Sequence, residues 1–66
     1  MESGTRRERE RTQREAEIVA AAERIFCEKG FESASMDEIA SAAQFTKRTV
    51  YLYFKGKEEL FFTAAL

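Results

Sequence analysis

Residues that interrupt helices are almost absent from this chain, and their scarcity limits its fold more than any other feature. Among its 66 residues there is no Pro, and Gly occurs only at positions 4, 30 and 56. No run rich in Val, Ile or Thr shows the strict apolar and polar alternation of a strand. The sequence therefore predicts an all-α fold, with helices joined by short turns.

The first helix is predicted by its apolar spacing. One of its faces carries Ile18, Ala22, Ile25 and Phe26. Two capping boxes compete for its start, Thr5 with Glu8 and Thr12 with Glu15. We prefer Thr12, because the apolar periodicity begins only after it.

Residues 1–11 then form a charged N-terminal extension, in which Arg and Glu are interleaved. Opposite charges four residues apart favour a solvated helix. An Arg-rich arm entering the minor groove of DNA is one alternative for this segment. The interleaved acids would repel DNA, so we expect a disordered or fraying solvated segment instead.

Turn signals separate the first helix from the second. Gly30 is expected to end the first helix in a left-handed conformation, which brings Phe26 and Phe31 into contact as in a Schellman motif. Ser35 is the predicted N-cap of the second helix, and Glu38 completes a capping box. The apolar face of this second helix is Met36, Ile39, Ala40 and Ala43.

Two further helices are predicted after a short turn at Gln44 and Phe45. Thr46 is the N-cap of the third helix, and Gly56 ends this helix and caps the fourth. The expected buried residues are Val50, Phe54 and part of Tyr53 in the third helix, and Leu60, Phe61 and Ala64 in the fourth. The apolar pattern is still running at Leu66, so we expect a fragment of a longer protein.

The second and third helices have the spacing of a helix-turn-helix. Ala40 supplies a small residue where the helices cross, four residues before Gln44 and ten before Val50. Any helical hairpin in a small bundle can show this spacing. Spacing alone therefore leaves both interpretations open.

The start of the third helix favours DNA binding. Lys47 and Arg48 lie in its first turn, where cations oppose the helix dipole at a cost of about 0.3–1 kcal/mol each. The placement is useful only if an anion binds there, either a phosphate or the acceptor edge of guanine. Thr49 and Tyr51 lie on the same outer side and can donate hydrogen bonds to phosphates. This interpretation requires that the domain's own carboxylates do not neutralise Lys47 and Arg48.

A family resemblance rests on the residues from Ser35 onward. The runs SMDEIA at 35–40, AQFTKRTVY at 43–51, YF at 53–54 and KEELF at 57–61 resemble the N-terminal domain of TetR-family regulators. The resemblance covers about residues 18–66 and implies a homeodomain-like helix-turn-helix domain of three helices plus the start of a fourth. It assigns the DNA-binding domain to residues 12–66. One departure is Gln44, where the family usually has Gly, so we expect a right-handed turn there.

The resemblance also implies roles for individual residues. The expected base-contacting residues are Lys47, Arg48, Thr49 and Tyr51. The expected phosphate-contacting residues are Ser35, Thr46, Tyr51, Tyr53 and Lys57. The implied protein is a homodimeric repressor that binds a pseudo-palindromic operator in double-stranded DNA, with a C-terminal domain, missing here, that holds the dimer and binds a small-molecule effector.

The alternative function is a small protein-interaction module that uses exposed apolar residues, namely Leu52, Phe62 and Leu66. An enzyme is not expected, because the chain has no His, no metal-ligand cluster and no Gly-rich phosphate loop. No cofactor or metal is expected either. Cys27 is the lone thiol and is expected to be a small buried residue, in a cytoplasmic, nucleoid-associated protein without a membrane segment.

Overall fold

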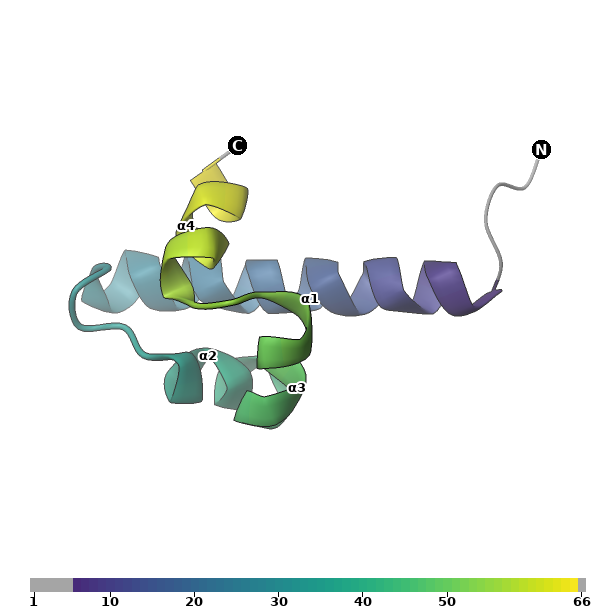
Figure 1. Cartoon of the computed structure of the whole chain (residues 1–66). Coiled ribbons are helices and arrows are strands. Elements are labelled where there is room, and N and C mark those ends of the chain that lie inside the picture. Colours follow the sequence, from purple (N-terminus) through teal and green to yellow (C-terminus); the bar gives the residue numbers. More distant parts are fainter. Residues whose placement is uncertain (1–5, 66) are drawn as a thin grey trace.

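Four helices follow one another along residues 6–65, the part of the chain that the computed structural model describes. They are α1 (Arg6–Lys29), α2 (Met36–Ala43), α3 (Lys47–Tyr53) and α4 (Lys57–Ala65). The long helix α1 packs against α2 and α4, and α2 packs against α3 (Figure 1). No strand occurs in this range, so the prediction of an all-α, helix-turn-helix fold is confirmed.

Helix α1 is longer than the sequence predicted. It begins at Arg6 rather than at Thr12, whose hydroxyl lies within the helix and donates to the carbonyl of Glu8 at 3.0 Å. The other possible cap, Thr5, lies outside the described residues. Ion pairs at i,i+4 spacing link Arg6 to Glu10 and Arg11 to Glu15, both at 3.7 Å. Such pairs each add a few tenths of a kcal/mol to an exposed helix, which explains why helical structure continues through the charged segment.

The ends of α1 and α2 follow the predicted signals. Gly30 has φ +83°, and its N–H donates to the carbonyl of Phe26 at 2.8 Å. The rings of Phe26 and Phe31 then meet, with centroids 5.6 Å apart. At α2, the Ser35 hydroxyl accepts from the Glu38 N–H at 3.1 Å, while the Glu38 carboxylate accepts from the Ser35 N–H at 3.2 Å. The predicted capping box is confirmed.

One apolar core joins all four helices. Its buried members are Ile18, Ala22, Met36, Ile39, Ala40, Val50, Phe54 and Leu60. Ala40, at 2% exposure, is the small residue predicted where α2 meets its neighbours. Since Val50 is fully buried, the opposite face of α3 must point to solvent.

Three further predictions about helix ends and burial are wrong in detail. Phe61 remains 47% exposed because it lies on the rings of Phe26 and Phe31 at the edge of the core, with centroids 5.6 and 5.3 Å away. Cys27 is exposed rather than buried, because half a helical turn separates it from Ile18, which places it on the side of α1 opposite the core. Helix α3 ends before Gly56, since the cap residue Phe54 is already extended.

Candidate nucleic-acid interface

The turn between α2 and α3 is held by backbone hydrogen bonds. The N–H of Gln44 donates to Ser41 at 3.0 Å, and that of Phe45 donates to Ala40 at 2.9 Å. Gln44 has φ 66° and ψ 34°, so the right-handed turn predicted from the sequence is wrong. A left-handed non-Gly residue costs about 1–2 kcal/mol. These bonds and the packing of Phe45 against the core offset that strain.

Thr46 begins α3 as predicted. Its hydroxyl accepts from the Thr49 N–H at 3.1 Å, and the two threonine hydroxyls are hydrogen-bonded to each other at 3.0 Å. The cap and the buried Val50 fix the rotation of α3 about its own axis. The side chains that this rotation exposes are Lys47, Arg48, Tyr51 and Leu52.

The two cations of the first turn differ in their surroundings. Lys47 Nζ lies 3.5 Å from Asp37 Oδ1 of α2, which contradicts the requirement that no carboxylate of the domain neutralises it. Arg48 has no carboxylate partner within residues 6–65. Both members of the Lys47–Asp37 pair are more than half exposed, and an exposed pair is worth only about 0–1 kcal/mol. The side chain of Lys47 can therefore exchange Asp37 for a phosphate at little cost.

A groove runs along one side of α3, between the start of α2 and the start of α4. Its polar lining includes Ser35, Asp37, Lys47, Tyr51, Lys55 and Lys57. The structure thus brings four of the predicted DNA-contacting residues to one place. Lys55 was not predicted as a contact, although its position in a stretch without acids, residues 44–57, was a usable signal.

Lys57 has a full set of partners within the protein. Its ammonium group donates to the carbonyls of Phe31 at 2.7 Å, Glu32 at 3.2 Å and Ala34 at 3.0 Å. It also lies 4.5 Å from the centre of the Phe31 ring. An ammonium group has three protons, so a contact with phosphate would require Lys57 to release one of these carbonyls.

Tyr53 borders the other side of α3 and joins it to α1. Its ring packs against the core, and its hydroxyl accepts from Arg14 Nη1 at 3.5 Å. Arg11 places its guanidinium 5.8 Å from the centre of the same ring. The hydrogen bond to Tyr53 raises the pKa of Arg14 further above its ordinary value. Sequence reasoning did not assign these arginines to the interface.

An ion pair ties the end of α1 to the start of α2. Lys29 Nζ donates to Glu38, the acid of the capping box. This hydrogen bond lowers the pKa of Glu38 against the opposing effect of desolvation, and it raises the pKa of Lys29. The first turn of α2, which borders the groove, is therefore fixed both by its own capping box and by the ion pair to α1.

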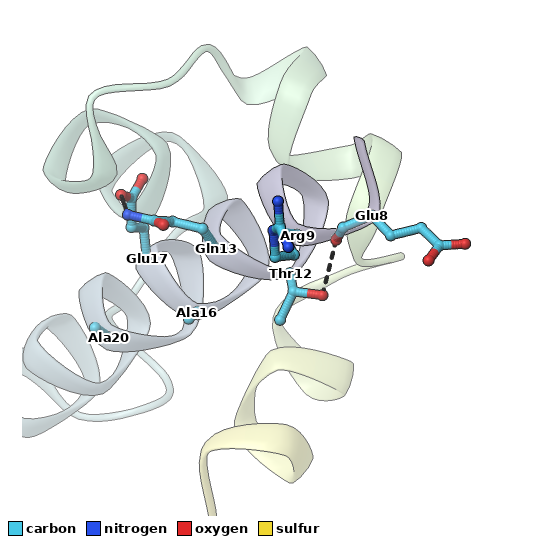
Figure 2. A pocket seen from close by; sticks show the side chains of 7 residues that line it. All are labelled: Glu8, Arg9, Thr12, Gln13, Ala16, Glu17 and Ala20. Carbon is cyan, nitrogen blue, oxygen red and sulfur yellow. Dashed lines mark hydrogen bonds between the residues drawn. The ribbon is translucent and has the colours of Figure 1, made fainter. Parts of the chain in front are cut away.

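A broad hollow on α1 has no features of a ligand site. All seven lining residues come from this one helix: Glu8, Arg9, Thr12, Gln13, Ala16, Glu17 and Ala20 (Figure 2). Its polar groups bond along the helix, as Gln13 does to Glu17 at 3.4 Å. Across residues 6–65 there is no cluster of three potential metal ligands. None of the described helices has the length and apolar character needed to cross a membrane.

Two helices joined by a tight turn, with the exposed face of the second flanked by basic groups, define a helix-turn-helix DNA-binding protein. Residues 18–64 match the family described as "Bacterial regulatory proteins, tetR family". The chain belongs to the TetR family of DNA-binding transcriptional regulators.

Named relatives agree with this assignment. The chain is 44% identical over 48 residues to YfiR of Bacillus subtilis, an uncharacterised regulator of the helix-turn-helix type, and 37% identical over 51 residues to the transcriptional activator FasR of Mycolicibacterium smegmatis. These matches cover 73% and 77% of the chain but only 23% of each relative. A solved structure of a HlyIIR mutant protein superposes with a TM-score of 0.79 at 37% identity, covering 82% of the chain and 30% of that protein.

Proposed function

We propose that the exposed face of α3 enters the major groove of DNA and reads an operator half-site. The observation that carries this proposal is the basic first turn of α3, which is held outward by the burial of Val50 behind it. In this arrangement Lys47, Arg48, Thr49 and Tyr51 face base edges. Ser35, Thr46, Tyr53 and Lys57, together with the Tyr51 hydroxyl, face phosphates.

Arg48 is the strongest candidate for base recognition. Its guanidinium has no ion-pair partner within residues 6–65, so it can bind a guanine through both acceptors without first leaving another group. Lys47 must first leave Asp37, 3.5 Å away, so we expect it to contribute less to specificity.

We further propose that the full regulator is a homodimeric repressor of a pseudo-palindromic operator. The matched region is only 23% of the relatives' length, and we assign dimerisation and the binding of a small-molecule effector to the remainder of such a protein. Two copies of α3 would then meet half-sites whose centres are about 34–36 Å apart, or a multiple of that distance. Because DNA is the ligand, we place the protein in the cytoplasm at the nucleoid. FasR is named an activator, so repression is the part of this proposal to test separately.

Selection of bound duplexes from a random library, followed by titration of variants, tests the proposal. Arg48→Ala should cost about 1–3 kcal/mol on the selected sequence and relax the preference at one base pair. Tyr51→Phe should keep any aromatic contact with a base and lose only the phosphate hydrogen bond, weakening all sequences alike. Arg24→Ala, an exposed change elsewhere on α1, is the matched control. If Arg48→Ala weakens the affinity for every sequence equally, Arg48 contacts the DNA backbone and not a base.

The alternative, an interaction module built on apolar residues, has weaker support. Leu52 and Phe62 are each 73% exposed, but they belong to α3 and α4 respectively, and Leu66 lies outside the described residues. Membership of the TetR family favours DNA binding. Salt separates the two functions, because phosphate-driven binding weakens steeply with ionic strength whereas apolar association does not.

A further inference from the structure

One side of α1 is apolar where it covers the core and basic where it extends past the core. The positions 7, 11, 14, 18, 22 and 25 are three or four residues apart and therefore share one side of the helix. Ile18, Ala22 and Ile25 occupy the part over the core. Arg7, Arg11 and Arg14, which we name the arginine stripe, occupy the part that extends past it. The arginine stripe therefore continues the side of α1 that packs against the core. Figure 1 shows that α2 and α3 lie together on one side of α1.

The arginine stripe lies directly beside the recognition helix. Its three residues line a shallow hollow together with Leu52 and Tyr53 of α3. Contacts with Tyr53 hold two of the guanidinium groups there, by the hydrogen bond from Arg14 and the position of Arg11 near the ring. Arg7 has no hydrogen bond or ion pair with any other residue of the described range. The stripe thus contributes cationic groups to a surface that α3 already forms.

Acids of α1 flank the arginine stripe without covering it. Glu10 and Glu17 lie close to Arg14 and line a hollow with it and Phe45, whereas Glu8 borders the hollow of Figure 2. Glu10 is paired with Arg6, and Glu15 is paired with Arg11 at 3.7 Å with both side chains well exposed. Exposed pairs of this kind are weak and exchange readily. The three guanidinium groups of the arginine stripe can therefore exchange these neighbouring carboxylates for phosphates at little cost.

The geometry points to a second line of phosphate contacts. A helix in the major groove, which is about 12 Å wide, has a phosphate strand on each side. The groove lined by Ser35, Tyr51 and Lys55 faces one side of α3, and the arginine stripe faces the other. We propose that Arg7, Arg11 and Arg14 bind the phosphate backbone of the DNA strand that borders the major groove beside Leu52 and Tyr53. This inference rests on the proposed function, in which α3 occupies that groove.

The test is a salt titration of binding to a mixed-sequence duplex. The variant replaces Arg7, Arg11 and Arg14 by Gln, and the control replaces Arg6, Arg9 and Arg24 by Gln, which removes the same charge from other sides of α1. Each phosphate contact contributes about 0.9 to the slope of log K against log salt. We expect the stripe variant to lose about 2–3 units of slope and to bind about tenfold or more weakly at fixed salt, with the control close to the parent chain. The ratio of selected to mixed-sequence affinity should stay unchanged, because phosphates carry no sequence information.

Two further results separate the possible failures. Arg14→Gln removes a contact with Tyr53, so thermal melts must show that the variants are folded, and Arg7→Gln alone should still lose about one unit of slope. If the parent chain binds duplex but the stripe variant keeps its full slope and affinity, the inference is overturned and the proposed function survives. If the control loses as much slope and affinity as the stripe variant, the effect comes from the net charge of α1 and not from the position of the arginine stripe. The inference is then also overturned. If the parent chain binds no duplex, the proposed function itself fails.

Discussion

Replacing Lys57 by Met removes an ammonium group that joins α4 to the connection between α1 and α2. Two of its three hydrogen bonds, to Phe31 and Ala34, are partly buried, while the bond to Glu32 is exposed and water can replace it. Losing the donor for each partly buried carbonyl costs about 1 kcal/mol. The contact with the Phe31 ring adds about 0.5 kcal/mol. We therefore expect a total loss of about 2–3 kcal/mol, with the stem of Met keeping the packing of the Lys methylenes.

This loss is large for so small a domain, whose unfolding free energy is expected to be about 3–10 kcal/mol. Thermal unfolding followed by circular dichroism should show a Tm lower by about 10–20 °C. Lys55→Met is the matched control, because Lys55 is exposed and its ammonium group has no partner among residues 6–65, and its effect should stay within about 0.5 kcal/mol. Equal melting temperatures for the two variants would refute the argument.

The same variant tests the predicted phosphate contact of Lys57. DNA binding is measured at a temperature where Lys57→Met remains folded. If Lys57 acts only within the protein, the salt dependence of binding stays that of the parent chain. A slope smaller by about one unit would instead show that Lys57 contacts phosphate and that its carbonyl partners are released on binding.

Substitutions at three positions, Gln44, Ser35 and Glu38, test the local geometry by urea or pH titration. Gln44→Gly should stabilise the domain by about 0.5 kcal/mol by relieving the left-handed backbone, and Gln44→Val should destabilise it by about 1 kcal/mol or more; equal stabilities would contradict the φ of 66°. Ser35→Ala should cost about 1 kcal/mol through the lost cap, and no loss would exclude the capping box. Because folding lowers the pKa of Glu38, its carboxylate adds to the free energy of unfolding. This contribution should be complete above the unfolded pKa of about 4.3 and should be lost as the pH falls through the lower pKa of the folded state. Folding raises the pKa of Lys29, so the stability that Lys29 contributes should be lost as the pH rises past about 10.4. Glu38→Gln should remove the pH dependence of stability at both the acidic and the basic end. An unchanged pH profile of stability would contradict the pairing of Lys29 with Glu38.

The features that the sequence predicted correctly depend on local interactions. The capping box of α2, the Thr46 cap and the left-handed Gly30 each involve residues within a few positions of one another, so the sequence pattern contains all the partners. The buried faces of α2 and α3 followed from helical spacing for the same reason. Local chemistry was therefore enough to place the helix-turn-helix.

The features that the sequence missed depend on residues far apart in the chain. Lys57 meets carbonyls 23–26 positions away, and Arg14 meets Tyr53 39 positions away, so neither partner can be read from spacing. The left-handed Gln44 depends on the packing of Phe45 against a core that forms from all four helices. The start of α1 was missed for a different reason, since several weak ion pairs together outweighed the absence of an apolar face.

The central claim is that the solvent-facing side of α3 is the surface that meets DNA. Backbone amide chemical shifts, recorded while a duplex selected from a random library is added to the protein, test this most directly. The account predicts that the largest changes fall on Lys47, Arg48, Tyr51 and Leu52, with smaller ones beside them at the start of α2 and in the first turns of α1. Changes confined to α4, with the amides of α3 unmoved at saturation, would contradict it.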